Sequence, residues 1–251
     1  YQKTLGRMRA CPLAAVAAVV NERHLRHIEE QSQELGFAAP ALVVEPTARD
    51  SGPALAAAAA WISSTYGPQT VVVAAPSDHL IPDEQDFARQ VARAIELARS
   101  GWIVTFGIRP TFASSEYGYI ARGAKIAGHA GGFAVTKFHE KPARKIAEAY
   151  VAHGGYDWNS GILVFSAGVF AEEAERHMPE LWAAVRQAVD KGARRDSALR
   201  LDAEAFSAAR RISIDHALME KCERVAVIPV TFEWSDVGSW DAVYHALEKD
   251  E

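Results

Sequence analysis

Short runs of apolar residues, many of them β-branched, recur along the chain. The runs occupy residues 16–20, 42–44, 71–75, 103–108, 133–138, 162–165 and 225–230. Each is about as long as one strand, and the nearly continuous apolar character is typical of strands that are buried on both faces. We therefore predict a sheet in the interior of the protein.

Segments with helical periodicity lie between the apolar runs. Residues 84–99 are the clearest case, because Pro82-Asp83 is a typical helix start and apolar side chains then recur at spacings of three and four, namely Phe87, Val91, Ile95 and Ala98. The alternation of strands and helices predicts an α/β fold in which a mostly parallel sheet is flanked by helices. In such sheets ligands bind beyond the carboxyl ends of the strands, so those loops are the first places to search for a site.

Composition and length favour one globular domain over residues 1–251. Of these residues, 49% are hydrophobic and 24% are charged, which is ordinary for a folded domain. The longest apolar runs, 13–20 and 54–62, are shorter than the ~20 residues of a membrane-spanning helix, so no membrane partner is expected. Residues from 109 to about 179 are richer in glycine and aromatic side chains, and we expect them to form a smaller lobe beside the sheet.

Charge and cysteine usage narrow the functional classes. The 27 Lys and Arg residues against 32 Asp and Glu give a net charge of −5, without the basic stripe that a nucleic-acid polymer would need. Cys11 and Cys222 lie far apart and the nine histidines are scattered, so neither set has the spacing of a metal site or a redox pair. A reducing cytoplasm is the expected location. The sequence has neither a nucleophile elbow nor a Walker-type loop, which weighs against hydrolases and kinases.

Two predicted strand ends carry carboxylates. Asp78 follows the run 71–75, and Asp236 follows the run 225–230, before a helix expected near Ser239. Either aspartate could simply cap a turn or a helix, as Asp often does. The two could instead hold Mg²⁺, which takes one or two carboxylates and fills its other positions with water and phosphate oxygens. The local pattern leaves both interpretations open.

Three further segments combine groups that suit a sugar phosphate. Glu140 and Lys141 stand side by side after the run 133–138: a carboxylate suits sugar hydroxyls and an ammonium suits a phosphate, although both could be ordinary solvated residues. The segments 117–120 and 158–161 pair aromatic or amide side chains with glycines that allow a ligand to approach, here Gly118, Asn159 and Gly161. The alternative for these two segments is a bulge or a turn.

The segment 45–54 joins a predicted strand to a predicted helix. A helix that starts with small residues offers free backbone donors to an anion or a base edge, which makes Gly52 a candidate. Glu45 could accept hydrogen bonds from the N1 and N2 donors of guanine, a pairing that other bases do not offer. The alternative is an ordinary helix cap made by Asp50 or Ser51.

Together these segments stand in the order and spacing of the bacterial mannose-1-phosphate guanylyltransferases, and the chain resembles that family almost from end to end. The matching segments are 45–54, 76–79, 105–108, 117–120, 140–142, 158–161, 213–215, 219–221 and 234–240. The resemblance implies a three-layer α/β/α Rossmann-like nucleotidyltransferase fold with a mostly parallel mixed sheet. It also implies an enzyme that transfers GMP from GTP to mannose 1-phosphate in the presence of Mg²⁺, giving GDP-mannose and pyrophosphate.

The resemblance also implies roles for individual residues. The metal-binding aspartates of the family fall on Asp78 and Asp236, and Lys141 matches the lysine on the sugar phosphate. These three are the expected catalytic residues. The sugar-binding positions of the family fall on Gly118, Glu140, Asn159 and Gly161.

Base recognition is expected within residues 45–54, with Glu45 and Gly52 as contacts, but three residues there depart from the family. Asp50 and Ser51 stand where Asn and Thr are usual, and Gly52 replaces a usual Ala. Another sugar-1-phosphate nucleotidyltransferase, making a uridylyl or thymidylyl sugar, therefore stays an alternative.

Members of the family open with a strand, the glycine-rich loop G-G-x-G-T-R-L-x-P and a Pro-Lys-Gln segment, and Tyr1 matches the part just after these. That loop would supply donors to the triphosphate, so we expect a truncated sequence rather than an enzyme that has lost its activity. A non-catalytic sugar-phosphate-binding module is the alternative from another class. In the enzyme, a phosphate oxygen of mannose 1-phosphate would attack the α-phosphorus of GTP in line, without a covalent intermediate. The oligomeric state stays open, and a homodimer is one option.

Overall fold

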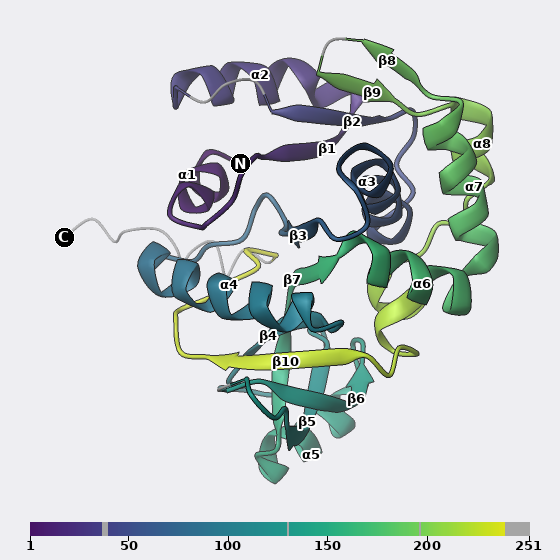
Figure 1. The fold of residues 1–251 in the computed structure, drawn as a ribbon. Coiled ribbons are helices and arrows are strands. Elements are labelled where there is room, and N and C mark those ends of the chain that lie inside the picture. The colour runs from purple at the N-terminus through teal and green to yellow at the C-terminus, as the bar shows by residue number, and fades with distance from the viewer. Residues whose placement is uncertain (37–39, 130, 196, 239–251) are drawn as a thin grey trace.

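The computed structural model describes residues 1–36, 40–129, 131–195 and 197–238, and the described strands form two sheets (Figure 1). The smaller sheet has the order β1-β2-β9-β8, with β1 at Ala17–Asn21, β2 at Ala41–Glu45, β9 at Ala198–Arg200 and β8 at Ala193–Arg195. The larger sheet has the order β3-β7-β4-β10-β6-β5, with β3 at Val71–Ala74, β7 at Tyr156–Ser166, β4 at Ile103–Ile108, β10 at Val225–Val230, β6 at Phe133–His139 and β5 at Tyr119–Lys125.

Helices connect most of these strands. They are α1 (Gln2–Arg9), the 3₁₀ turn η1 (Glu22–His24), α2 (Leu25–Glu34), α3 (Ser51–Tyr66), α4 (Glu84–Arg99), α5 (Arg144–His153), α6 (Ala167–His177), α7 (Pro179–Asp190), α8 (Ala203–Ala208) and the π-helical turn η2 (Asp215–Met219). α4 has the predicted bounds, its four apolar residues are buried, and Asp83 caps it by accepting a hydrogen bond from the Asp86 N–H at 2.8 Å.

Helices cover both faces of the six-stranded sheet. Alternate residues of a strand point to opposite sides, so a strand with continuous apolar residues has two faces to bury. On one face, Ile103 and Leu163 belong to a core that includes residues of α3, α6 and α7. On the other face, the neighbouring Val104 and Val164 belong to a core built on α4, which lies across the strands (Figure 1). This arrangement confirms the predicted three-layer α/β/α fold.

Strand direction in the larger sheet is mixed. β3, β4, β10 and β5 run in one direction, and β7 and β6 run in the other. β7 lies between β3 and β4 and pairs antiparallel with both. Most strands therefore share a direction, as predicted, while most neighbouring pairs among the described strands are antiparallel.

Each predicted strand overlaps an observed one, and the runs 103–108 and 225–230 coincide with β4 and β10. Burial on both faces was expected throughout, but β1 and β3 are largely half-exposed. The reason is their position, because each stands at the end of its described sheet and pairs on one side only.

The residues expected to form a lobe, 109 to 179, occupy two kinds of position. β5, β6 and α5 gather at one end of the six-stranded sheet, whereas β7 runs through the sheet and α6 packs against α3 (Figure 1). The division into a main body and a lobe stays a prediction.

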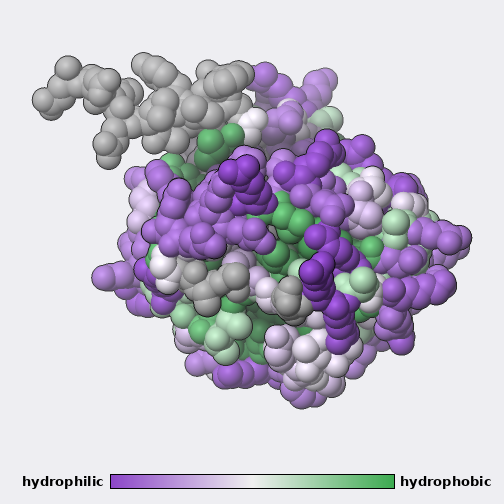
Figure 2. Space-filling model, turned by 90° about the horizontal axis from the view of Figure 1, so that it is seen from above, coloured by the Kyte–Doolittle hydropathy of each residue, from purple (hydrophilic) through white to green (hydrophobic). Residues whose placement is uncertain are grey.

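Hydrophilic side chains cover most of the face seen from above the view of Figure 1, and hydrophobic ones show between them (Figure 2). Among the described residues, no helix combines the length and the apolar character needed to cross a membrane.

Candidate active site

The structure brings the two predicted aspartates to one edge of the sheet. Leu80, after β3, and Ser235, after β10, exchange backbone hydrogen bonds of 2.9 and 3.0 Å. Asp78 and Asp236 flank this bridge, and both carboxylates act on the same imidazole: burial lowers the pKa of His79, and the two negative charges oppose that shift. Two carboxylates from distant parts of the sequence therefore share one electrostatic environment.

The two aspartates differ in their hydrogen bonds. Asp236 Oδ1 accepts from the Tyr117 hydroxyl at 3.2 Å and from the Gly238 N–H at 3.1 Å, so part of its expected turn-capping role is present. Burial, aided by the charge of Asp236, raises the pKa of Tyr117 to about 12, which keeps the phenol a donor. Asp78 is exposed and makes no side-chain hydrogen bond to any described residue.

The backbone after Asp236 is strained. Val237 has φ 53°, a left-handed conformation that a β-branched residue adopts only when its surroundings impose it. Ser239 and Trp240, the last residues of the matching segment, lie outside the described residues, as does the helix expected near Ser239.

Two of the predicted sugar-binding residues, Glu140 and Asn159, lie against a third, Gly118. The Asn159 N–H donates to the Gly118 carbonyl oxygen at 2.8 Å. A Cβ atom on residue 118 would lie 2.6 Å from Glu140 Oε2 and 3.4 Å from Asn159 Cβ, so glycine is what allows this close approach. Gly118, Glu140 and Asn159 thus form one cluster, which we call the sugar-side cluster.

The amide of Asn159 is held in one orientation by its neighbours. Its Oδ1 accepts from the Thr105 hydroxyl at 2.8 Å and from the Gly161 N–H at 3.2 Å, while its Nδ2 donates to Asp215 Oδ1 at 3.0 Å. Asp215 begins the π-helical turn η2, and burial raises its pKa. We did not assign a role to Asp215 from the sequence, although the segment 213–215 was one of the matching segments.

Glu140 lies among other carboxylates. Its N–H donates to Glu220 Oε1 at 3.0 Å. Burial, followed by the negative charge of Asp215, raises the pKa of Glu140 to about 7, and the charges of Lys141 and His216 oppose this shift. Lys141 is exposed and has φ 45°, so the backbone bends sharply where its side chain leaves the strand end. Glu220, like Asp215, is a neighbour that our sequence analysis missed.

Gly161 connects the sugar-side cluster to the aspartates. It has φ 71° at an irregularity in the pairing of β4 with β7, so the predicted bulge is present. A Cβ atom here would lie 3.5 Å from His79 Cε1 and 3.8 Å from Pro76 Cγ. The turn that carries Asp78 is therefore packed directly against the strand that carries Asn159.

The segment 45–54 holds two buried polar atoms without partners. Glu45 Oε1 and Arg49 Nε are both buried, and neither makes a hydrogen bond within the described part of the chain. Burial raises the pKa of Glu45 to about 7. Among the described residues, no side-chain hydrogen bond joins Glu45 to the aspartates or to the sugar-side cluster. A buried and unpartnered carboxylate oxygen is expected where a ligand supplies the donor.

Gly52 is explained by packing. Its N–H donates to the Ile212 carbonyl oxygen at 3.0 Å, and a Cβ atom would lie 2.6 Å from that oxygen. The backbone donor expected to be free for a ligand is therefore occupied, and contact of Gly52 with a substrate stays a prediction. The helix cap also follows the simpler interpretation, because Asp50 accepts from the Ser51 N–H at 2.7 Å.

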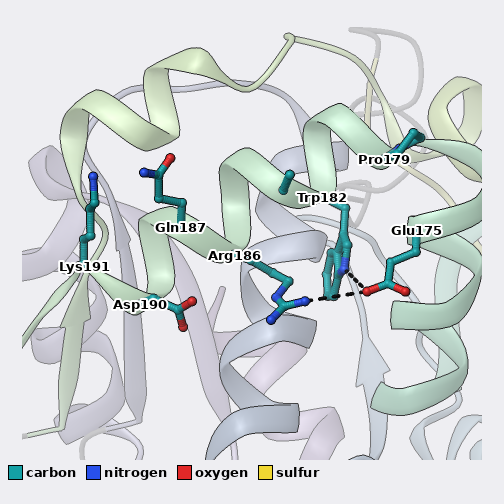
Figure 3. Close-up of a pocket in the computed structure, with 8 residues that line it drawn as sticks. Glu175, Pro179, Trp182, Arg186, Gln187, Asp190 and Lys191 are labelled. Carbon is teal, nitrogen blue, oxygen red and sulfur yellow. Dashed lines mark hydrogen bonds and ion pairs between the residues drawn. The ribbon is translucent and has the colours of Figure 1, made fainter.

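Two hollows of similar size lie on the described surface. One, of about 510 Å³, borders the loop after β10 through Trp234 and Ser235. The other, of about 500 Å³, lies on α6 and α7, where Glu175 contacts the Trp182 Nε1 at 3.4 Å and Arg186 at 3.6 Å (Figure 3). The second hollow is lined by none of the predicted site residues.

The chain is similar in sequence to known proteins over nearly its whole length. The chain is 40% identical over 245 residues to the xanthan biosynthesis protein XanB of Xanthomonas campestris pv. campestris, and 38% identical over 251 residues to the mannose-1-phosphate guanylyltransferase of Sinorhizobium fredii. These matches cover 97% and 100% of this chain but 51% and 49% of the two relatives. The chain spans about half the length of the curated relatives it matches.

The fold is also found in solved structures. A crystal structure described as mannose-6-phosphate isomerase from Helicobacter pylori superposes with a TM-score of 0.83 at 26% identity, covering 94% of this chain and 89% of that chain. The sequence model of the nucleotidyl transferase family matches residues 1–251. With the family pattern present from the first residue to the last and the fold shared with a solved relative, the chain belongs to the nucleotidyl transferase family.

Proposed function

We propose that this chain carries the activity that transfers GMP from GTP to mannose 1-phosphate, giving GDP-mannose and pyrophosphate. The observation that carries the proposal is the position of Gly161, whose N–H donates to Asn159 of the sugar-side cluster and whose backbone lies against the turn of Asp78. A sugar phosphate bound by the first would present its phosphate to the carboxylates of the second. The printed name of the S. fredii relative supports mannose 1-phosphate as the sugar.

Asp78 and Asp236 are the residues that would hold Mg²⁺. Their carboxylates are the hard oxygen donors that this ion prefers. Asp78 makes no side-chain hydrogen bond to a described residue. Asp236 uses Oδ1 for both of its side-chain hydrogen bonds to described residues, so its Oδ2 is the oxygen we assign to the ion. When bound, Mg²⁺ supplies positive charge that stabilises the phosphates.

The sugar-side cluster would bind the mannosyl group. The carboxyl group of Glu140, with a pKa raised by burial to about 7, can accept a hydrogen bond from a sugar hydroxyl or donate one near neutral pH. The fixed amide of Asn159 adds a positioned polar group. Lys141 would bind the phosphate of the sugar, because an ammonium is a suitable point charge for it.

Glu45 would select guanine. Its unpartnered Oε1 can accept from the N1 and N2 donors of the base, and such donors would favour the ionised carboxylate and lower the raised pKa. Uracil and thymine offer no such pair of donors. The nearby unpartnered Arg49 Nε is a further group that a nucleotide oxygen could satisfy.

The reaction requires positioning and charge stabilisation. A phosphate oxygen of mannose 1-phosphate attacks the α-phosphorus of GTP, in line with the bond from that phosphorus to the oxygen that bridges to the β-phosphorus. The new P–O bond forms as the bridging bond breaks, and pyrophosphate leaves with the electron pair of that bond. No side chain forms a covalent intermediate; the described residues hold the two substrates and offset their charge.

The test uses the complete protein with mannose 1-phosphate, Mg²⁺ and one of GTP, UTP or dTTP, and it measures pyrophosphate and the sugar nucleotide by chromatography. We expect GDP-mannose with GTP and little product with the pyrimidine nucleotides. A product formed only with UTP or dTTP would contradict the assignment of Glu45 and favour another sugar-1-phosphate nucleotidyltransferase. Binding of mannose 1-phosphate without any turnover would favour a non-catalytic module.

A further inference from the structure

A second group of chemically active side chains lies outside the proposed active site. Glu173 and His177 are one turn apart on α6, so both lie on the same face of that helix. Cys222 reaches them from the link between η2 and β10. The linear spacing of cysteines and histidines does not indicate this group, because His177 and Cys222 are 45 positions apart in the sequence.

The two distances from the Glu173 carboxylate match those of a tetrahedral metal site. Glu173 Oε2 lies 3.3 Å from His177 Nε2 and 3.3 Å from Cys222 Sγ, and the three atoms are all within 4.8 Å of one another. Bonds of about 2.0–2.3 Å to a tetrahedral Zn²⁺ place neighbouring ligand atoms about 3.3–3.6 Å apart. To admit the ion, His177 Nε2 and Cys222 Sγ would have to stand at the same spacing, which their present separation of at most 4.8 Å brings within reach of a side-chain rotation.

The two oxygens of the Glu173 carboxylate have different partners. Glu173 is fully buried, and its Oε1 pairs with Arg176 at 3.4 Å and Arg224 at 3.5 Å. Its Oε2 points to the imidazole and the thiol. Such outer partners hold a ligating carboxylate in place. The His177 side chain is 19% exposed, which leaves a route from solvent and room for a fourth ligand.

We propose that Glu173, His177 and Cys222 bind a Zn²⁺ ion, with water as the fourth ligand. Carboxylate, imidazole and thiolate together are a donor set typical of zinc, whereas Mg²⁺ prefers oxygen alone. In the structure, the Cys222 thiol donates a hydrogen bond to Glu173 Oε2. On binding, the S–H bond breaks, its proton passes to solvent and the sulfur lone pair forms the Zn–S bond, without any change of oxidation state.

The ion would act on stability and on the sugar side of the site rather than on the reacting phosphates. It would tie α6 to the link that begins with η2. That turn starts at Asp215, which accepts from Asn159, and is followed by Glu220, which accepts from the Glu140 N–H. Zinc would therefore reduce the movement of two residues that position the sugar-side cluster.

Titration with Co²⁺, a coloured substitute for Zn²⁺, tests the proposal on the complete protein with Mg²⁺ in excess to occupy carboxylate sites. We expect one equivalent of Co²⁺ to give a thiolate-to-cobalt charge-transfer band and tetrahedral d–d bands, both displaced by Zn²⁺. Cys222→Ser should abolish the charge-transfer band, and His177→Gln should weaken Co²⁺ binding by at least about 10-fold. Cys11→Ser, at the other buried free cysteine, is the matched control and should bind as the parent does.

A second measurement guards against variants that do not fold. Zn²⁺ should raise the thermal unfolding midpoint of the parent and of Cys11→Ser, since the assembled site binds the ion more tightly than the unfolded chain does. Native mass spectrometry should count one ion per chain. The proposal is overturned if the parent shows no thiolate band, if Cys222→Ser keeps the band, or if Asp236→Asn removes it. Because these readouts do not involve turnover, they are independent of the proposed transferase activity.

Discussion

Replacing Gly118 by alanine tests whether Glu140 and Asn159 form the sugar side of the site. The new Cβ atom would lie 2.6 Å from Glu140 Oε2, whereas real Cβ atoms stay beyond 3.0 Å and mostly beyond 3.4 Å of their neighbours. The carboxylate oxygen must therefore move by 0.4 to 0.8 Å. Contact with Asn159 Cβ at 3.4 Å is ordinary and requires no movement.

We expect this movement to lower activity while leaving the stability of the fold nearly unchanged. Gly118 has no left-handed φ, and the atom that must move is the far end of a flexible side chain, so we expect the free energy of unfolding to change by less than about 1 kcal/mol. A displacement approaching 1 Å in a positioning group costs on the order of 100-fold in rate. We expect kcat/KM for mannose 1-phosphate to fall about 10- to 100-fold, or about 1.4–2.7 kcal/mol of transition-state stabilisation.

Steady-state release of pyrophosphate measures the effect, with mannose 1-phosphate varied at saturating GTP and the reverse, and urea unfolding measures stability. Gly6→Ala is the control, because a Cβ atom there meets nothing within 4 Å. The reasoning also predicts that Gly118→Ala adds little to the defect of Glu140→Ala. Unchanged kcat/KM for the sugar phosphate, or equal losses for both substrates, would refute it.

Three further predictions concern other residues of the site. Asp236→Asn should lower kcat by on the order of 100-fold or more with an unchanged circular-dichroism spectrum, because a metal ion contributes several kcal/mol, and near-normal turnover would remove Asp236 from the site. Lys141→Ala should raise the KM for mannose 1-phosphate about 10-fold, since a charged hydrogen bond is lost, and equal changes in both KM values, measured in the same assay, would contradict its role. Burial raises the pKa of Glu45 and of Glu140 to about 7 from 4.5, so the folded chain holds more protons than the unfolded chain in this interval, and the free energy of unfolding should fall as pH rises through it. Urea titrations at several pH values should show a shallower fall in Glu45→Gln, and an identical fall in parent and variant would contradict the raised pKa of Glu45.

Local patterns account for much of the fold. β4, β10 and α4 have the predicted bounds. In each of them the spacing of apolar residues fits the element that buries those residues against the core. β7 extends well beyond the predicted run 162–165. The apolar pattern did not indicate its first half, because polar residues such as Asn159 and Ser160 lie there. β5 was missed because it carries Arg122 and Lys125 and has a partly exposed outer half.

The site, like the fold, was predicted in part. The sequence by itself determined which residue types stand at the strand ends: the aspartates, the Glu140-Lys141 pair and the glycines at 118 and 161. Only the tertiary structure decided that Asp215 holds the Asn159 amide, that Glu220 holds the Glu140 backbone, and that Cys222 meets α6. The physical reason is that strand and helix preferences act between near neighbours, whereas burial, pKa shifts and contacts across tens of residues exist only after the sheet and its helices have packed.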